Sequence, residues 1–157
     1  PNSEAVYFNG NYSPKNQTTL SILDRGFLFG DGVYELIPVY NKHIFYIKDH
    51  LTRLKSSLES INIDPSLVDD DEFIKIINSL IELNDYVNHY IYIHISRGVD
   101  KKRNHIYSKK CEPTILIMGE NYKPFDKSTI EHGKKAIIED DYRWLKSNIK
   151  SLSLIHI

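Results

Sequence analysis

The order of the predicted elements is the feature that most constrains the fold of this chain. Segments with strand character come first, two amphipathic helical segments follow, and further strand segments come after them. Strands on either side of a pair of helices are typical of an α+β fold, in which an antiparallel sheet carries its helices on one side. We therefore expect an antiparallel sheet with two helices packed against one face.

The two helices are predicted from apolar residues that recur at steps of three and four. The first covers residues 49–61, and Asp64 and Pro65 end it. The second covers residues 70–83 and begins with acidic residues, which the helix dipole favours. The apolar positions are Leu51, Leu54, Leu58 and Ile61 in the first helix, and Phe73, Ile76, Ile77, Leu80 and Ile81 in the second.

The strands are predicted from runs of β-branched and aromatic residues between turn signals. The pair Asn9 and Gly10 indicates the turn of a small hairpin, and Pro38 indicates an edge or a bulge in its strand. Residues 24–32 are interpreted as a loop punctuated by glycine. The predicted extended segments are 5–8, 18–23, 33–40, 44–47, 89–96, 114–118 and 135–139.

A domain boundary is predicted near residues 122–126, which have the composition of a linker. We expect a small α+β domain over residues 1–120, an interdomain linker over 121–134, and the first strands of a second domain over 135–157. The last residues are apolar and include no helix stop and no polar tail. An apolar segment needs a partner surface, so we expect either a truncated chain or a last strand docked on the sheet.

Composition excludes several classes of protein. The 157 residues carry 20 basic and 21 acidic side chains, a balance that argues against nucleic acid as the main partner. The single cysteine, Cys111, excludes an internal disulfide and a multi-cysteine zinc site, and it fits a reducing cytoplasm. No apolar run approaches the roughly 18 residues of a membrane helix. Residues 1–20 lack the apolar core of a signal peptide.

Lys150 is the first candidate for chemistry, because its neighbours Ile149 and Leu152 favour burial. A buried ammonium has a lowered pKa, and the neutral amine is a nucleophile that can form a Schiff base with an aldehyde. Spacing alone favours a solvated lysine at a strand edge over a buried one.

Four further side chains are candidates for binding. Arg103 and His105, two residues apart, can together hold a carboxylate, although they also fit a basic surface loop. Arg53 borders the apolar stripe of the first helix, where it can meet a phosphate or extend to solvent. Tyr34 begins a strand beside a glycine-rich loop and can direct its hydroxyl into a cleft. The seven histidines are scattered without metal-ligand spacing, so no metal site is expected.

Taken in order, six blocks resemble the class IV (fold type IV) pyridoxal-phosphate-dependent aminotransferases, and most closely their D-amino acid branch. The blocks are DRGFLFGDGVYE at 24–35, HLTRL at 50–54, ISRG at 95–98, RNH at 103–105, EDDYRWL at 139–145 and IKSL at 149–152. The resemblance implies an N-terminal α+β lobe followed by the start of a larger, truncated cofactor-binding domain at 135–157. It also implies a homodimer that uses pyridoxal 5'-phosphate.

The resemblance implies a role for each candidate residue. Lys150 matches the lysine that holds the cofactor as an internal aldimine and moves the proton. Arg53 matches an arginine that binds the cofactor phosphate, and Tyr34 matches a tyrosine of the substrate pocket. Arg103 and His105 match the pair that holds the substrate carboxylate, contributed by the neighbouring subunit. The implied activity is transamination between a D-amino acid of the D-alanine type and a 2-oxo acid of the 2-oxoglutarate type.

Three alternatives stay open. A branched-chain amino acid aminotransferase or an aminodeoxychorismate lyase of the same family would share Lys150 and Arg53. A non-catalytic N-terminal lobe would bind no cofactor. A nucleic-acid module would rest only on Lys101, Lys102 and Arg103, against a balanced net charge.

Overall fold

A computed structural model describes residues 4–156, except 86, 124, 147 and 150. Two compact units, residues 1–124 and 125–157, are recognised by their internal contacts, and each is described by itself. None of the helices in the described residues is long and apolar enough to span a bilayer.

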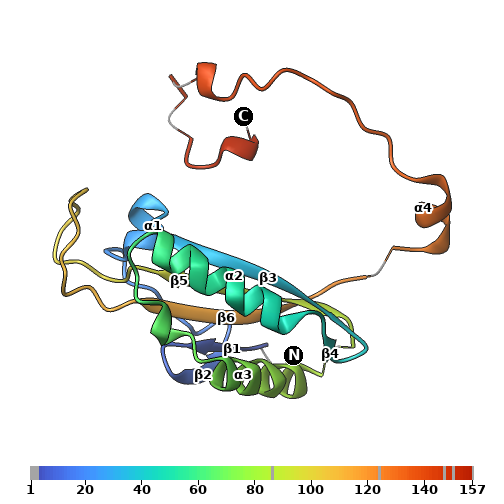
Figure 1. The fold of residues 1–157 in the computed structure, drawn as a ribbon, viewed down its shortest axis with the longest axis horizontal. Coiled ribbons are helices and arrows are strands. Elements are labelled where there is room, and N and C mark those ends of the chain that lie inside the picture. The colour runs from blue at the N-terminus through green and yellow to red at the C-terminus, as the bar shows by residue number, and fades with distance from the viewer. Residues whose placement is uncertain (1–3, 86, 124, 147, 150, 157) are drawn as a thin grey trace. The chain divides into compact units, whose positions relative to one another are not determined.

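The first unit is built on a six-stranded antiparallel sheet with the strand order β2-β1-β6-β5-β3-β4 (Figure 1). The predicted α+β class with an antiparallel sheet is therefore confirmed. The strands are β1 (Ala5–Phe8), β2 (Asn11–Pro14), β3 (Gly32–Tyr40), β4 (His43–Ile44), β5 (His89–Ser96) and β6 (Thr114–Asn121). The helices of this unit are α1 (Arg25–Phe29), α2 (Ile47–Ser60) and α3 (Asp70–Asn84), with a 3-10 turn η1 at Pro65–Leu67.

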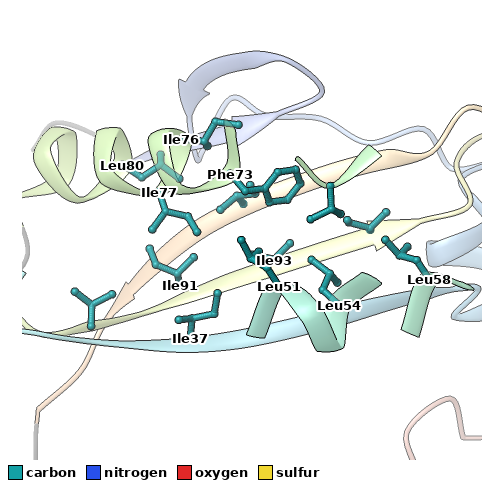
Figure 2. Close-up of a cluster of buried hydrophobic side chains, with 14 of the residues drawn as sticks. Ile37, Leu51, Leu54, Leu58, Phe73, Ile76, Ile77, Leu80, Ile91 and Ile93 are labelled. Carbon is teal, nitrogen blue, oxygen red and sulfur yellow. The ribbon is translucent and has the colours of Figure 1, made fainter. Parts of the chain in front are cut away.

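The two long helices pack on one face of the sheet, as predicted. The helix α2 contacts β3, and α3 contacts β1 and β6. The strand register places isoleucines side by side on the core face of the sheet, since Ile37 is paired with Ile91 and Ile93 with Ile117. Figure 2 shows the helix side chains meeting those of the strands. The core is a single cluster that includes Leu51, Leu54, Leu58, Phe73, Ile76, Ile77, Leu80 and Ile81.

Among the described residues of the first unit, no long helix packs on the opposite face of the sheet. Alternation along the strands places Tyr34, Tyr92, His94, Met118 and Val6 on this face. The segment before α1 approaches it, and residues of this segment and of β1, β5 and β6 line a partly open pocket of about 380 Å³. One strand, β3, therefore serves two sides, because its even-numbered residues face this open surface and its odd-numbered residues face the core.

Local signals explain where the helices begin and end. The side chain of Asp69 caps α3 by accepting a hydrogen bond from the backbone N–H of Glu72, and acidic residues fill the first turn. A similar cap at Asp24, together with Gly30 at a φ of 65°, bounds the short helix α1. The segment 24–32, interpreted as a loop from its glycines, therefore contains one helical turn.

Pro38 lies where the sequence places it, near an open edge. The strand β4 has only two residues and pairs with Val39 and Tyr40. The carbonyl of Pro38 accepts from the backbone N–H of Phe45 on that side, so the missing N–H of Pro38 also points away from β5. Proline therefore removes no hydrogen bond from the long β3–β5 ladder.

Three expected extended segments differ from the structure, and one of them, 44–47, is strand at Ile44 alone. Residues 18–23 form no ladder, because local bonds close a turn in which the Asp24 N–H donates to the Ser21 carbonyl. Tyr46 and Ile47 are not strand, because the chain turns at Tyr46 with a φ of 47° and α2 starts at Ile47.

Residues 135–139 are the third such segment, and the structure gives them no strand. A strand requires neighbouring backbone partners, and none of the described residues of 125–157 forms a ladder. The second unit contains α4 (Lys127–His132) and the 3-10 turns η2 (Trp144–Lys146) and η3 (Leu154–His156). The expected first strands of a second domain are therefore absent from the described residues, and the domain limits at 120 and 134 stay a prediction.

The assignment of the core predicts a large loss of stability at one leucine of α3 and a small change at another. Leu80 is 1% exposed and Leu83 is 60% exposed. Leu80→Ala leaves a cavity and should lower the free energy of unfolding by about 2–5 kcal/mol. Leu83→Ala, the matched control, should change it by less than about 0.5 kcal/mol. Urea denaturation followed by circular dichroism measures both, and equal losses would contradict this assignment of the core.

Candidate functional site

Arg53, on the second turn of α2, is anchored by a buried carboxylate of β3. Its Nε and Nη2 donate to the two oxygens of Glu35 at 2.5 and 2.8 Å. One turn earlier on α2, His50 Nδ1 lies 2.8 Å from Glu35 Oε2. The Glu35 side chain is 3% exposed and that of Arg53 is 68% exposed. The guanidinium therefore extends from a buried anchor to the surface in a fixed orientation.

The electrostatics of this cluster favour a charged pair. Burial alone would raise the pKa of the Glu35 carboxyl, but hydrogen bonds from Arg53 and His50 outweigh burial and hold that pKa below its usual value. The bonds to Glu35 raise the pKa of Arg53, and nearby Tyr34 acts in the same direction. A guanidinium has five N–H donors, and the contacts with Glu35 occupy Nε and Nη2. The remaining donors fit an anion such as a phosphate.

Tyr34 precedes Glu35 on β3 and points to the open face of the sheet. Its side chain is 66% exposed, and its ring lies 6.0 Å from that of Tyr92. The hydroxyl of Tyr92 is 2.9 Å from Nδ1 of His94. Tyr34 therefore stands at the exposed end of an aromatic row with its hydroxyl accessible to a ligand.

Arg103 and His105 come together on one aromatic ring. Both lie in the connection between β5 and β6, residues 97–113, and both contact Phe29 of α1. The guanidinium carbon of Arg103 is 4.9 Å from the centre of the Phe29 ring, and the imidazole centre of His105 is 5.1 Å from it. Both side chains are exposed. Two donors suited to a carboxylate thus lie beside the same ring.

The base of this connection is closed by a tight backbone approach. Gly98 has a φ of 92°, and a Cβ atom there would lie 1.7 Å from the carbonyl oxygen of Glu112. Any side chain at this position would push the two ends of the loop apart. The carbonyl of Gly98 also accepts from the backbone N–H of Arg25, which ties the loop to α1 at 2.9 Å.

A nearly buried charge cluster lies beneath the loop, centred on Asp31. Arg97 donates to Asp31 through Nε and Nη2 at 2.9–3.1 Å, and Arg25 donates through Nε at 2.8 Å. The side chains of Arg25 and Arg97 are 4% and 8% exposed. Burial would raise the pKa of Asp31, but the bonds from Arg97 and Arg25 dominate and lower it. The carboxylate is therefore held charged between two guanidinium groups.

Lys150, the predicted nucleophile, lies outside the described residues. Among the other predicted site residues, the structure brings Arg103 and His105 together and gives Arg53 and Tyr34 neighbouring positions on α2 and β3. In the described part of the chain, no group of three or more His, Cys, Asp or Glu side chains is placed to hold a metal ion.

Several residues at the site were missed by sequence reasoning. Glu35, His50, Arg25 and Asp31 were given no role, yet each orients a candidate residue or the loop that carries it. A signal existed for Glu35, since a period of two places it on the same strand face as Ile37 and Val39. A carboxylate on a core face needs a charged partner. Arg25 had no comparable signal, because its loop contacts are 79 and 80 residues away.

Comparison with known proteins assigns the chain to a family. The family model described as "Amino-transferase class IV" matches residues 32–157. The chain belongs to the class IV aminotransferases. The matched region begins at Gly32, so it includes Glu35, Arg53 and the loop with Arg103 and His105.

Curated relatives of this class IV chain include D-alanine aminotransferases. The Staphylococcus aureus (strain MSSA476) protein is 33% identical over 153 residues, which make up 97% of this chain and 53% of that protein. The Bacillus licheniformis protein is 34% identical over 151 residues, 96% of this chain and 52% of that protein. The chain therefore spans about half the length of the curated relatives it matches.

Solved structures agree with the class IV fold. A branched-chain amino acid aminotransferase from Escherichia coli matches with a TM-score of 0.69 and 19% identity, covering 76% of this chain and 41% of that one. A 4-amino-4-deoxychorismate lyase from Pseudomonas aeruginosa matches with a TM-score of 0.64 and 19% identity, covering 82% and 44%. At these identities the likeness establishes the fold of this class IV aminotransferase chain.

The Glu35 cluster predicts a specific acid response. In the unfolded chain a glutamate has a pKa of about 4.3, and the folded pKa lies below its usual value. The carboxylate therefore stabilises the fold fully above that unfolded value, and this contribution is lost as the pH falls through the folded pKa. Glu35→Gln should lower the free energy of unfolding at pH 7 and make its decline below about pH 4.3 shallower.

Denaturant unfolding at a series of pH values measures this difference. The exposed Glu59 is on the same helix as Arg53, so Glu59→Gln serves as the control and should follow the wild-type curve. An acid decline in Glu35→Gln as steep as in the wild type would show that Glu35 does not provide the response.

Proposed function

We propose that the protein carrying this chain catalyses pyridoxal-phosphate-dependent transamination between a D-amino acid and a 2-oxo acid. The donor is of the D-alanine type and the acceptor is of the 2-oxoglutarate type. The observation that carries the proposal is the joint position of Arg103 and His105 on Phe29, in a chain one third identical to D-alanine aminotransferases along almost its whole length. Because the chain spans about half of those relatives, the activity is proposed for the whole protein.

Arg53 is proposed to bind the cofactor phosphate. Its exposed guanidinium has donors beyond those that Glu35 accepts, and a rigid planar fork suits phosphate oxygens. Glu35 and His50 limit the rotamers that Arg53 can adopt, so less conformational entropy is lost when an anion binds. The donor set therefore fits the phosphate group.

Lys150 is proposed as the catalytic amine. Pyridoxal phosphate, when bound, supplies an aldehyde that condenses with amines and a ring that accepts the electron pair of the broken Cα–H bond. The Lys150 amine would hold the cofactor before substrate binds, and would then take the Cα proton as a general base and return it as a general acid. This role requires an amine with a lowered pKa, which the apolar neighbours of Lys150 in the sequence favour.

Arg103, His105 and Tyr34 are proposed to hold the substrate carboxylate. A guanidinium and an imidazole two residues apart can provide three or more hydrogen bonds to one carboxylate, and a phenol can add another. In one chain Tyr34 contacts Tyr92, whereas the pair contacts Phe29. In the proposed homodimer, the pair acts on the site of the neighbouring subunit. The dimer and the cytoplasmic location stay predictions.

Lys150→Ala should abolish the visible absorption of bound pyridoxal phosphate in the whole protein. Borohydride reduction followed by peptide mass spectrometry should place the adduct on Lys150 in the wild type. Lys135→Ala, which removes an exposed lysine of the same region, is the control and should keep the absorption. An unchanged spectrum in Lys150→Ala would remove Lys150 from its role, and no adduct in the wild type would favour a non-catalytic lobe.

Arg103→Ala should raise the KM for D-alanine by about tenfold or more, because a charge-assisted hydrogen bond to the substrate is lost. The affinity for pyridoxal phosphate should stay within about twofold. Steady-state kinetics with D-alanine and 2-oxoglutarate measures the first quantity and absorption titration the second, with Lys102→Ala as the adjacent control. Equal losses in both would make Arg103 structural, and turnover of aminodeoxychorismate in place of D-alanine would identify a lyase.

A further inference from the structure

We infer that Arg25 is a positioning residue that fixes the loop of Arg103 and His105 and thereby sets the affinity for the substrate carboxylate. This inference rests on the proposed function for its kinetic consequence. Its structural part, that one buried guanidinium holds the loop, stands on contacts within the described residues.

Arg25 holds the loop through the backbone at the two positions that matter. Its Nη1 donates to the carbonyl oxygen of Asn104 at 2.6 Å, and its Nη2 donates to the carbonyl oxygen of His105 at 3.1 Å. Asn104 lies between Arg103 and His105, so the two bonds hold the backbone next to Arg103 and at His105 itself. Fixing two consecutive peptide groups restricts the directions in which both side chains leave the backbone.

The other end of Arg25 is tied to the body of the fold. Its Nε donates to Asp31, which also accepts hydrogen bonds from Arg97. Arg97 in turn donates to the carbonyl oxygens of Ile61 and Asn62, just after α2. A continuous set of hydrogen bonds therefore runs from the end of α2 through Arg97, Asp31 and Arg25 to the loop.

The short helix α1 presents both supports of the loop from one face. Arg25 and Phe29 are four residues apart, so their side chains are neighbours on the helix, and the Arg25 guanidinium lies 4.8 Å from the Phe29 ring centre. The Phe29 ring contacts the side chains of Arg103 and His105, while the Arg25 guanidinium donates to the backbone carbonyls of Asn104 and His105. The cap at Asp24 fixes α1 itself, because Ser96 and Thr114 donate to its carboxylate at 2.8 and 2.7 Å.

Arg25 is placed to act through the loop and not on the substrate. Its side chain is 4% exposed and has two acidic neighbours, Asp31 at 2.8 Å from Nε and Asp100 at 3.9 Å from Nη1. Three of its five N–H donors bond to Asp31 and to the two loop carbonyls. A lysine has one nitrogen and cannot reach three acceptors in a plane, so Arg25→Lys keeps the charge and loses the geometry.

The test uses Arg25→Lys in the whole protein and two measurements. The first is the rate of trypsin cleavage after the exposed residues Lys101, Lys102 and Arg103. It should rise about tenfold or more when the loop opens more readily. The second is the KM for D-alanine, which should rise about fivefold or more, while kcat and cofactor affinity stay within about twofold. Lys42→Gln removes an exposed ion pair with Asp85 elsewhere and is the control that should change neither.

A second variant covers the case in which Arg25→Lys does not fold. Asp31→Asn keeps the volume at the anchor of Arg25 and weakens the hold on both Arg25 and Arg97, so both measurements should shift in the same direction. Wild-type cleavage and KM values in a folded variant would overturn the inference. Faster cleavage with an unchanged KM, or losses of KM and cofactor affinity by the same factor, would also overturn it. If the wild type does not transaminate D-alanine, the proposed function fails, and the trypsin rates alone decide whether Arg25 holds the loop.

Discussion

The carboxylate of Asp31, held between two almost fully buried guanidinium groups, is the interaction on which the arrangement of this lobe depends. Arg97 connects Asp31 to the end of α2, because it also donates to the carbonyls of Ile61 and Asn62. Arg25 connects Asp31 to the loop between β5 and β6, because it donates both to Asp31 and to two carbonyls of that loop. Breaking such a buried pair leaves an uncompensated charge, which costs about 3–5 kcal/mol. The cluster therefore connects a polar loop to the end of α2 by hydrogen bonds.

Glu35 repeats the same principle on a neighbouring element. A buried acid at the margin of the core orients a guanidinium, and in this case the guanidinium of Arg53 reaches the surface. The two acids serve different ends. Asp31 holds two arginines that donate to backbone carbonyls, whereas Glu35 holds one arginine whose guanidinium is exposed. The strand β3 positions both acids, because it begins directly after Asp31 and carries Glu35 on its core face.

The sequence predicted what depends on local pattern. Steps of three and four defined the buried stripes of α2 and α3 (Figure 2), and β-branched runs located β5 and most of β6. Prediction failed at residues 18–23 and 135–139, because strand composition cannot supply the backbone partner that a strand needs. It also missed the contacts of Arg25, since the direction of a side chain toward a carbonyl 79 residues away depends on the tertiary fold. The roles of Lys150, Arg53, Tyr34, Arg103 and His105 came from resemblance and stay proposals.

A crystal structure of the whole protein grown with pyridoxal phosphate tests the central claim most directly. We expect continuous electron density between the Lys150 side-chain nitrogen and the cofactor, with the guanidinium of Arg53 in contact with the phosphate while Glu35 still holds its Nε. A Lys150 amine in bulk solvent and far from Arg53, with the cofactor absent or bound elsewhere, would contradict the assignment of this chain to a transaminase site.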